Sequence, residues 1–177
     1  MLTLTPIKTT DSAYSFVEQL LHDSFPLAER RDDEAQRYNT DHNPRFACYF
    51  IADDELPVGV ITVWNLDGFY YLEHLATSLS VRNKGYGKLI MKQIRDLLTG
   101  LLILEVERPE DEMSRRRIGF YQRCGLMLCE KNYIQPAYRK GGEEVPLFLM
   151  FSGKDNIDDD FEAIRRSIYR EVYLVEI

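Results

Sequence analysis

Residues 82–88 combine glycines, basic side chains and a junction between two secondary-structure patterns, which suits the binding of an anion. A strand pattern precedes them and a helix pattern follows. At such a junction, unpaired backbone N–H groups and the positive end of a helix dipole face the same point. Glycine lets the backbone approach a ligand closely and adopt a positive φ. The candidate anion-binding residues are Arg82, Asn83, Lys84, Gly85, Tyr86, Gly87 and Lys88.

Charge supports this interpretation, because the local sign is opposite to that of the whole chain. Every charged residue between 82 and 95 is basic, whereas the 177-residue chain carries a formal net charge of −7. A negative overall field repels nucleic acid and anionic membrane surfaces. We therefore expect no nucleic-acid or membrane partner, and a small anionic ligand at the loop.

Two other phosphate-binding motifs do not fit the loop. A dinucleotide fingerprint requires glycine where Ile90 stands, and a P-loop requires Ser or Thr where Leu89 stands. A dinucleotide fold also usually presents its glycine loop after the first strand, whereas three strand patterns in a row precede residue 82 here. A nucleotide-dependent enzyme is thus the weaker alternative.

The elements that must position the loop follow from hydrophobic periodicity. We expect strands at 2–7, 46–52, 58–66, 69–78, 101–106, 126–134 and 145–151, and helices after residue 10, within 26–40, and at 88–98 and 112–123. The order β-α-α-β-β-β-α-β-α-β-β, plus a C-terminal helix, predicts an α+β fold of three layers. Its mixed, mostly antiparallel central sheet has about seven strands and is flanked by helices.

The length and the 45% hydrophobic content suit one domain, which we place at residues 1–153. Residues 154–177 form an amphipathic helical extension. Its apolar stripe consists of Phe161, Ile164, Ile168 and Val172, and it should pack on this domain or on a second copy in a homodimer.

Three cysteines without CxxC spacing indicate reduced structural thiols. The first residues lack a basic segment followed by a long apolar stretch, and no later segment approaches the ~18 apolar residues of a membrane span. We therefore expect a soluble, cytoplasmic protein. The histidines His22, His42 and His74 show no ligand spacing, so we expect no metal.

Together these features resemble the GNAT superfamily of N-acetyltransferases. The family's acyl-CoA loop has the pattern Arg/Gln-x-x-Gly-x-Gly/Ala between a strand and a helix, and residues 82–87 match it. Residues 117–126 resemble a second family signature, in which Phe-Tyr is followed by glycine and an apolar residue. The resemblance covers nearly all of residues 2–151.

The resemblance implies acetyl-CoA as co-substrate and a primary amine as acceptor. The backbone of residues 82–88 would hold the pyrophosphate, and the strand end at Leu75, Ala76 and Thr77 would pair with the pantetheine arm. Ser114 stands where relatives often have an asparagine that contacts this arm. A non-catalytic acyl-CoA-binding sensor or subunit is the alternative function.

Transfer to an amine requires that amine to be neutral, so a base should lie near the reacting carbonyl. Glu73 is the candidate, because a carboxylate in the middle of an apolar strand is costly unless it is paired or faces a wet cleft. A structural ion pair is its alternative role. His74, on the opposite strand face, better fits a hydrogen-bonded core histidine. By resemblance, Tyr121 would protonate the departing thiolate, or else be a core aromatic beside Phe120.

The acceptor side, by resemblance, involves residues 26–40 and 133–145. The acidic run 32–34 could attract a cationic amine, and Tyr133 and Tyr138 could stack on it. A solvated helix face explains the acidic residues equally well, so the acceptor stays open.

Overall fold

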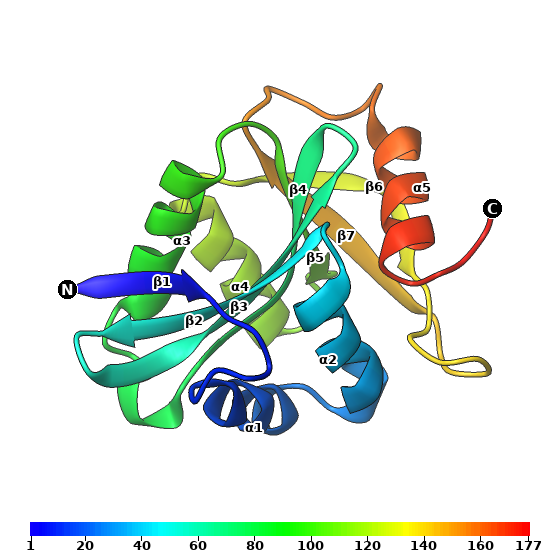
Figure 1. Cartoon of the computed structure of the whole chain (residues 1–177). Coiled ribbons are helices and arrows are strands. Elements are labelled where there is room, and N and C mark those ends of the chain that lie inside the picture. Colours follow the sequence, from blue (N-terminus) through cyan, green and yellow to red (C-terminus); the bar gives the residue numbers. More distant parts are fainter. The chain divides into compact units, whose positions relative to one another are not determined.

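The structure is a computed structural model that describes residues 1–177, the whole printed sequence (Figure 1). It has an α+β fold with five α-helices and a seven-stranded sheet. The strands are β1 (Leu2–Pro6), β2 (Phe46–Asp53), β3 (Leu56–Leu66), β4 (Phe69–Thr77), β5 (Leu102–Glu107), β6 (Met127–Gln135) and β7 (Val145–Ser152). The helices are α1 (Tyr14–Ser24), α2 (Asp33–His42), α3 (Tyr86–Leu97), α4 (Glu112–Arg123) and α5 (Phe161–Glu171).

The predicted order of elements is confirmed, and the strands are arranged as β1-β2-β3-β4-β5-β7-β6. The main difference from prediction concerns the helix expected within residues 26–40. Only a short 3-10 helix (Leu27–Glu29) forms in the first part, and α2 begins at Asp33. Acidic residues in the first turn of α2 interact favourably with the helix dipole, which favours this start. The helix ends at His42 because Asn43 precedes a proline and is driven out of the α region.

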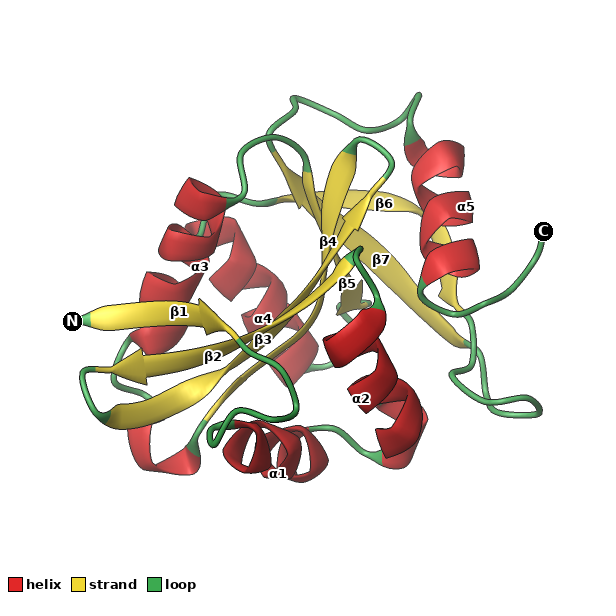
Figure 2. Ribbon diagram, in the orientation of Figure 1, coloured by secondary structure: helices red, strands yellow, loops and turns green.

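The chain forms two compact units. The first comprises residues 1–64 and 72–93. Here β1, β2 and β3 are antiparallel neighbours, with Leu4 opposite Ile51 and Ile51 opposite Gly59. The central strand β2 contacts α2 (Figure 2). The core of this unit includes Val17, Ile51, Val60, Ile61 and Ile90, all fully buried.

The second unit comprises residues 65–71 and 94–177. Strand β7 lies between β5 and β6 and is antiparallel to both. Helix α4 contacts β5 and β6. The boundary expected at residue 153 does not separate these two units. The prediction that residues 154–177 form an extension distinct from the domain therefore stays a prediction.

The apolar stripe of the C-terminal helix is buried within this second unit. Phe161, Ile164, Ile168 and Val172 are each at most 5% exposed. The hydroxyl of Tyr169, on the same helix, donates a hydrogen bond to a β6 backbone carbonyl. The helix therefore packs on its own chain, which was one of the two expected arrangements.

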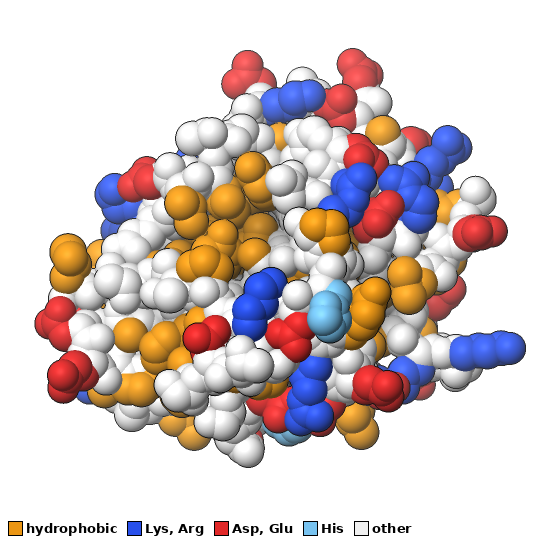
Figure 3. All heavy atoms as spheres, in the orientation of Figure 1, with side chains coloured by type: hydrophobic (Ala, Val, Ile, Leu, Met, Phe, Trp, Pro, Cys, Tyr) orange, Lys and Arg blue, Asp and Glu red, His pale blue; other side chains and the backbone are white.

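The surface carries mixed charge. Basic and acidic side chains are interspersed over the face drawn in Figure 3. None of the helices combines the length and the apolar character needed to cross a membrane.

Candidate functional site

The loop between β4 and α3 has the backbone geometry that its glycines predict. After β4 ends at Thr77, a short 3-10 helix (Leu79–Val81) reverses the chain. Asn83 and Gly85 then adopt positive φ values of 63° and 82°. A Cβ added at Gly85 would meet no atom within 4 Å. The loop backbone is therefore open at the point where a ligand would approach.

The first turn of α3 offers unpaired backbone donors. The amide of Leu89 makes the first helical hydrogen bond, to the carbonyl oxygen of Gly85 at 3.4 Å. The amides of Tyr86, Gly87 and Lys88 precede it, and such groups have no partner within a helix. Arg82, Lys84 and Lys88 are exposed around them. Donors, helix dipole and basic side chains thus come together at this turn.

The side chain of Tyr86 anchors the loop to the end of β2. Its hydroxyl donates a 2.7 Å hydrogen bond to the carboxylate of Asp53 at the end of β2. This bond and the ammonium group of Met1 lower the pKa of Asp53, while Asp53 raises the pKa of Tyr86. Sequence reasoning assigned Tyr86 only a backbone role, because nothing in its spacing indicates Asp53 as a partner.

The end of β4, where the pantetheine arm is expected, lies unusually close to β3. A Cβ added at Gly59 would lie 2.3 Å from the carbonyl oxygen of Ala76. One residue pair further, the Ser78 amide donates to the Val58 carbonyl at 2.8 Å. Glycine at position 59 therefore sets the path of the strand end that carries Leu75, Ala76 and Thr77.

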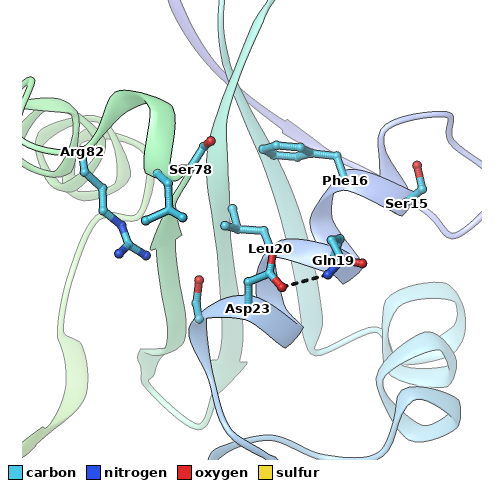
Figure 4. Close-up of a pocket in the computed structure, with 9 residues that line it drawn as sticks. Ser15, Phe16, Gln19, Leu20, Asp23, Ser78 and Arg82 are labelled. Carbon is cyan, nitrogen blue, oxygen red and sulfur yellow. Dashed lines mark hydrogen bonds between the residues drawn. The ribbon is translucent and has the colours of Figure 1, made fainter.

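A pocket of about 440 Å³ lies between α1 and the start of the loop (Figure 4). Arg82 projects from the loop wall, and Phe16, Leu20 and Asp23 from the α1 wall. The hydrogen bond between Gln19 and Asp23, 2.8 Å long, fixes the polar part of the α1 wall. The pocket is lined by Ser15, Phe16, Gln19, Leu20, Asp23, Ser24, Ser78, Leu79 and Arg82.

Glu73 is held in a buried ion pair. Its side chain is 0% exposed and accepts hydrogen bonds from the guanidinium of Arg31 and, at 2.8 Å, from the indole of Trp64. Burial by itself would raise the pKa of Glu73, but the charge of Arg31 and these hydrogen bonds outweigh it and lower the pKa. The contacts favour the ion-pair role over the base role. Arg31 was not predicted as the partner, since 42 residues separate the two.

His74 is buried, and its Nε2 lies 2.8 Å from the carbonyl oxygen of Glu29. Because a carbonyl only accepts, Nε2 carries the proton. Its ring lies 4.4 Å from the ring of Phe25. Burial lowers the pKa of His74, so the ring is neutral at neutral pH. These contacts agree with a hydrogen-bonded core histidine.

Tyr121 and Ser114 lie on α4, in the second unit. Tyr121 is half-buried with its ring 5.1 Å from that of Phe120, and burial raises the pKa of its hydroxyl, so it is protonated at neutral pH. Ser114 is buried, and its hydroxyl donates to Asp111 at 2.8 Å and to Glu107 at 3.1 Å. Its backbone amide is capped by Asp111. Contact of either residue with a ligand stays a prediction.

A second buried glutamate, Glu105 on β5, was not singled out from the sequence. Its carboxylate accepts hydrogen bonds from the hydroxyls of Tyr133 (2.5 Å) and Tyr173 (2.8 Å) and from the amide of Gln135 (2.7 Å). Burial raises the pKa of Glu105, and these neutral donors offset the rise only in part. The signal was available, because Glu105 interrupts an apolar strand as Glu73 does.

Stacking of Tyr133 on an acceptor, one of the expected alternatives, is wrong. Tyr133 is 0% exposed, and its ring packs against Phe161 and Tyr169. Its hydroxyl is directed to Glu105. Tyr138 is half-buried, with its ring 4.9 Å from that of Tyr173.

The first unit thus brings together the loop 82–88, the strand end 75–77 and Glu73, while Tyr121 and Ser114 belong to the second unit. Within the acidic run, Asp33 pairs with His22 at 2.7 Å, and the hydrogen bond from His22 lowers the pKa of Asp33. No group of three or more His, Cys, Asp or Glu side chains is arranged to hold a metal ion.

Comparisons with known proteins identify the family of the chain. Residues 14–126 match the model of the acetyltransferase (GNAT) family. A chain from Bacteroides thetaiotaomicron that is assigned to the same family is 44% identical in sequence, with a TM-score of 0.95 over 98% of this chain and 99% of that one. No curated protein sequence matches the chain.

Two more distant structures share the fold. A Bacillus subtilis acetyltransferase in complex with CoA is 15% identical, with a TM-score of 0.57 over 87% of this chain and 99% of that one. A dodecameric spermidine N-acetyltransferase from Vibrio cholerae is 13% identical, with a TM-score of 0.63 over 90% of this chain and 97% of that one.

Proposed function

The chain belongs to the acetyltransferase (GNAT) family, and from this premise we propose that it moves an acetyl group from acetyl-CoA to a primary amine by direct attack within a ternary complex. The observation that supports the donor most strongly is the loop at the start of α3. There, the backbone at Gly85 is open, and the first amides of the helix lie among exposed basic residues.

The loop fits a pyrophosphate group on chemical grounds. Backbone amides at a helix N-terminus bind anions whatever the neighbouring side chains are, and Arg82, Lys84 and Lys88 add positive charge. The strand end 75–77 would pair with the amide groups of the pantetheine arm, because its position is fixed by the close approach of Gly59 to Ala76. The fold neighbour from Bacillus subtilis, which was solved with CoA, supports the same ligand class.

In the reaction, the acceptor nitrogen attacks the thioester carbonyl carbon, and the bond from that carbon to sulfur breaks. A backbone N–H of β4 would stabilise the negative charge that develops on the carbonyl oxygen. Tyr121 would donate its proton to the departing sulfur, which its raised pKa permits because the hydroxyl stays protonated at neutral pH. The proton of the amine leaves to a base or to water.

A primary amine is the acceptor class that the relatives support. The fold neighbour from Vibrio cholerae acts on spermidine. The 44% identical chain supports the family and not a particular acceptor, so the acceptor itself must be found by experiment.

The test is a thioester-consumption assay with acetyl-CoA and a panel of primary amines that includes spermidine, amino acids and short peptides. We expect turnover with at least one amine. We also expect acetyl-CoA to raise the melting temperature more than NAD or ATP does. Binding of acetyl-CoA without any turnover would favour the non-catalytic sensor.

A loop variant provides the matched control. Lys88→Ala should weaken acetyl-CoA binding, whereas Lys92→Ala, one turn further along the exposed side of α3, should leave it nearly unchanged. Equal effects of the two variants would remove the loop as the pyrophosphate site.

A further inference from the structure

Two neighbouring residues of β4 hold the segment that connects α1 to α2. Glu73 accepts a hydrogen bond from Arg31, and His74 donates to the carbonyl oxygen of Glu29 at 2.8 Å. The segment is therefore fixed to β4 at two points only two residues apart. All of these residues belong to the first unit.

Arg31 is fixed from several sides. It is 7% exposed, and its guanidinium donates to the side-chain oxygen of Gln36 at 2.6 Å as well as to Glu73. The guanidinium carbon lies 5.5 Å from the ring of Trp64 and 5.8 Å from that of Phe46. A buried guanidinium is costly unless it is paired, so the partner carboxylate determines where Arg31 can lie.

Glu73 is poorly placed to accept a proton from a substrate. A general base must lie within about 2.6–3.2 Å of the proton donor, or reach it through one water, so a substrate or water must have access to one of its lone pairs. One carboxylate oxygen of Glu73 accepts from Arg31 and the other accepts from Trp64, and the side chain has no exposed surface. Its lowered pKa agrees with an ionised partner for Arg31.

We propose that Glu73 acts on the reaction through Arg31, as a positioning residue that fixes residues 25–32 as a wall of the acceptor site. This rests on the proposed function, because the acceptor role of that segment comes from the family resemblance. Loss of the pair would let the segment move, which weakens acceptor binding and leaves the donor loop unaffected.

The test compares Glu73→Gln, Arg31→Met and the double variant with the wild type. We expect each single variant to raise KM for the best acceptor amine by about tenfold, equivalent to about 1.4 kcal/mol, with KM for acetyl-CoA nearly constant. The double variant should be no worse than the poorer single variant, because the two residues act as one unit. The acidic limb of the pH profile of kcat/KM should persist in Glu73→Gln.

The opposite pattern would overturn the proposal. If Glu73→Gln loses kcat and the acidic limb while Arg31→Met keeps both, Glu73 is the base. Glu18→Gln is the control, since it breaks the 2.7 Å pair with Arg37 that joins α1 to α2 without involving β4. It should leave both KM values unchanged. Arg31→Lys, which keeps the charge, covers the case in which Arg31→Met does not fold.

Failure of the proposed function can be told apart from failure of this inference. If the wild type consumes no thioester with any amine, hydrogen exchange of the backbone amides in residues 27–32 becomes the readout. Faster exchange in Glu73→Gln and Arg31→Met, but not in Glu18→Gln, supports the positioning role. Unchanged exchange overturns it.

Discussion

The hydroxyl of Tyr86, in the middle of the glycine loop, donates a 2.7 Å hydrogen bond to Asp53 at the end of β2. The loop is thereby tied to the β2–β3 hairpin through a side chain and not through its backbone amides. The same residue can thus offer its backbone to an anion and its side chain to the fold.

Tyr86→Phe should loosen the loop, because it removes the hydrogen bond to Asp53, while every backbone N–H group of the loop is kept. The bond is only partly buried, so we expect KM for acetyl-CoA to rise by only about twofold to fivefold. KM for the acceptor should not change. Asp53→Asn should reproduce the effect, and steady-state kinetics with varied acetyl-CoA measures it. An equal rise in both KM values would show that the anchor acts on the whole site.

Gly59→Ala should disturb the strand end that is expected to bind the pantetheine arm. The new Cβ would lie 2.3 Å from the Ala76 carbonyl oxygen, so the backbone of β4 has to move. Such overpacking costs about 1–3 kcal/mol, and the shift should also raise KM for acetyl-CoA. Thermal unfolding and kinetics check the two effects.

Gly119→Ala is the matched control for this change. Gly119 lies within α4, and its only close neighbour would be the flexible end of Arg123 at 3.3 Å. Alanine is favoured over glycine in a helix by about 0.5–1 kcal/mol, so this variant should be slightly more stable than the wild type. A loss of stability equal to that of Gly59→Ala would contradict the steric explanation.

The fold could be predicted from the sequence because its signals are local. Alternating and helical periodicities, the turn at residues 67–68 and the glycine loop each lie within a few residues, and the elements they predict are present. The start of α2 was less clear, because residues 26–40 are charged throughout and no apolar stripe distinguishes the helix from the segment before it.

The site was predictable only as far as its backbone. A loop that binds through amides is recognisable from glycine spacing, whereas side-chain partners depend on which distant residues the fold brings together. The charge in the middle of β4 indicated that Glu73 needs a partner or a wet cleft, but not that Arg31 supplies it. The same signal is present at Glu105, but it does not indicate that Tyr133, Tyr173 and Gln135 are the partners.

Glu105→Gln should stabilise the protein at neutral and alkaline pH. The pKa of Glu105 is raised in the folded state, so wild-type stability is complete below the unfolded-state pKa and falls as pH rises through the folded-state value. Each pKa unit corresponds to about 1.4 kcal/mol. The melting temperature of the variant should therefore exceed that of the wild type by a margin that grows as the pH rises from the unfolded-state pKa of Glu105 towards its raised folded-state pKa.

Glu130→Gln is the control for this pH series, since Glu130 is exposed on β6. Its melting temperature should follow the wild type at every pH. A margin for Glu105→Gln that stays constant with pH would mean that the variant changes packing, and not the protonation of a buried carboxyl.

Tyr121→Phe should slow the chemical step without weakening substrate binding. A general acid contributes about 100-fold to 10,000-fold, and a thiolate is a good leaving group, so we expect a fall in kcat near or below the lower end of that range. Burial raises the pKa of Tyr121, so its deprotonation limits the rate only at high pH, and the variant should lose that basic limb of the pH profile.

Tyr169→Phe is the control, because it removes the hydroxyl of another tyrosine whose pKa is raised by burial. That variant should melt earlier through loss of its hydrogen bond to the Ile134 carbonyl, yet keep kcat and the basic limb. If Tyr121→Phe also keeps both, water or another group must protonate the departing thiolate, and Tyr121 is a core aromatic beside Phe120.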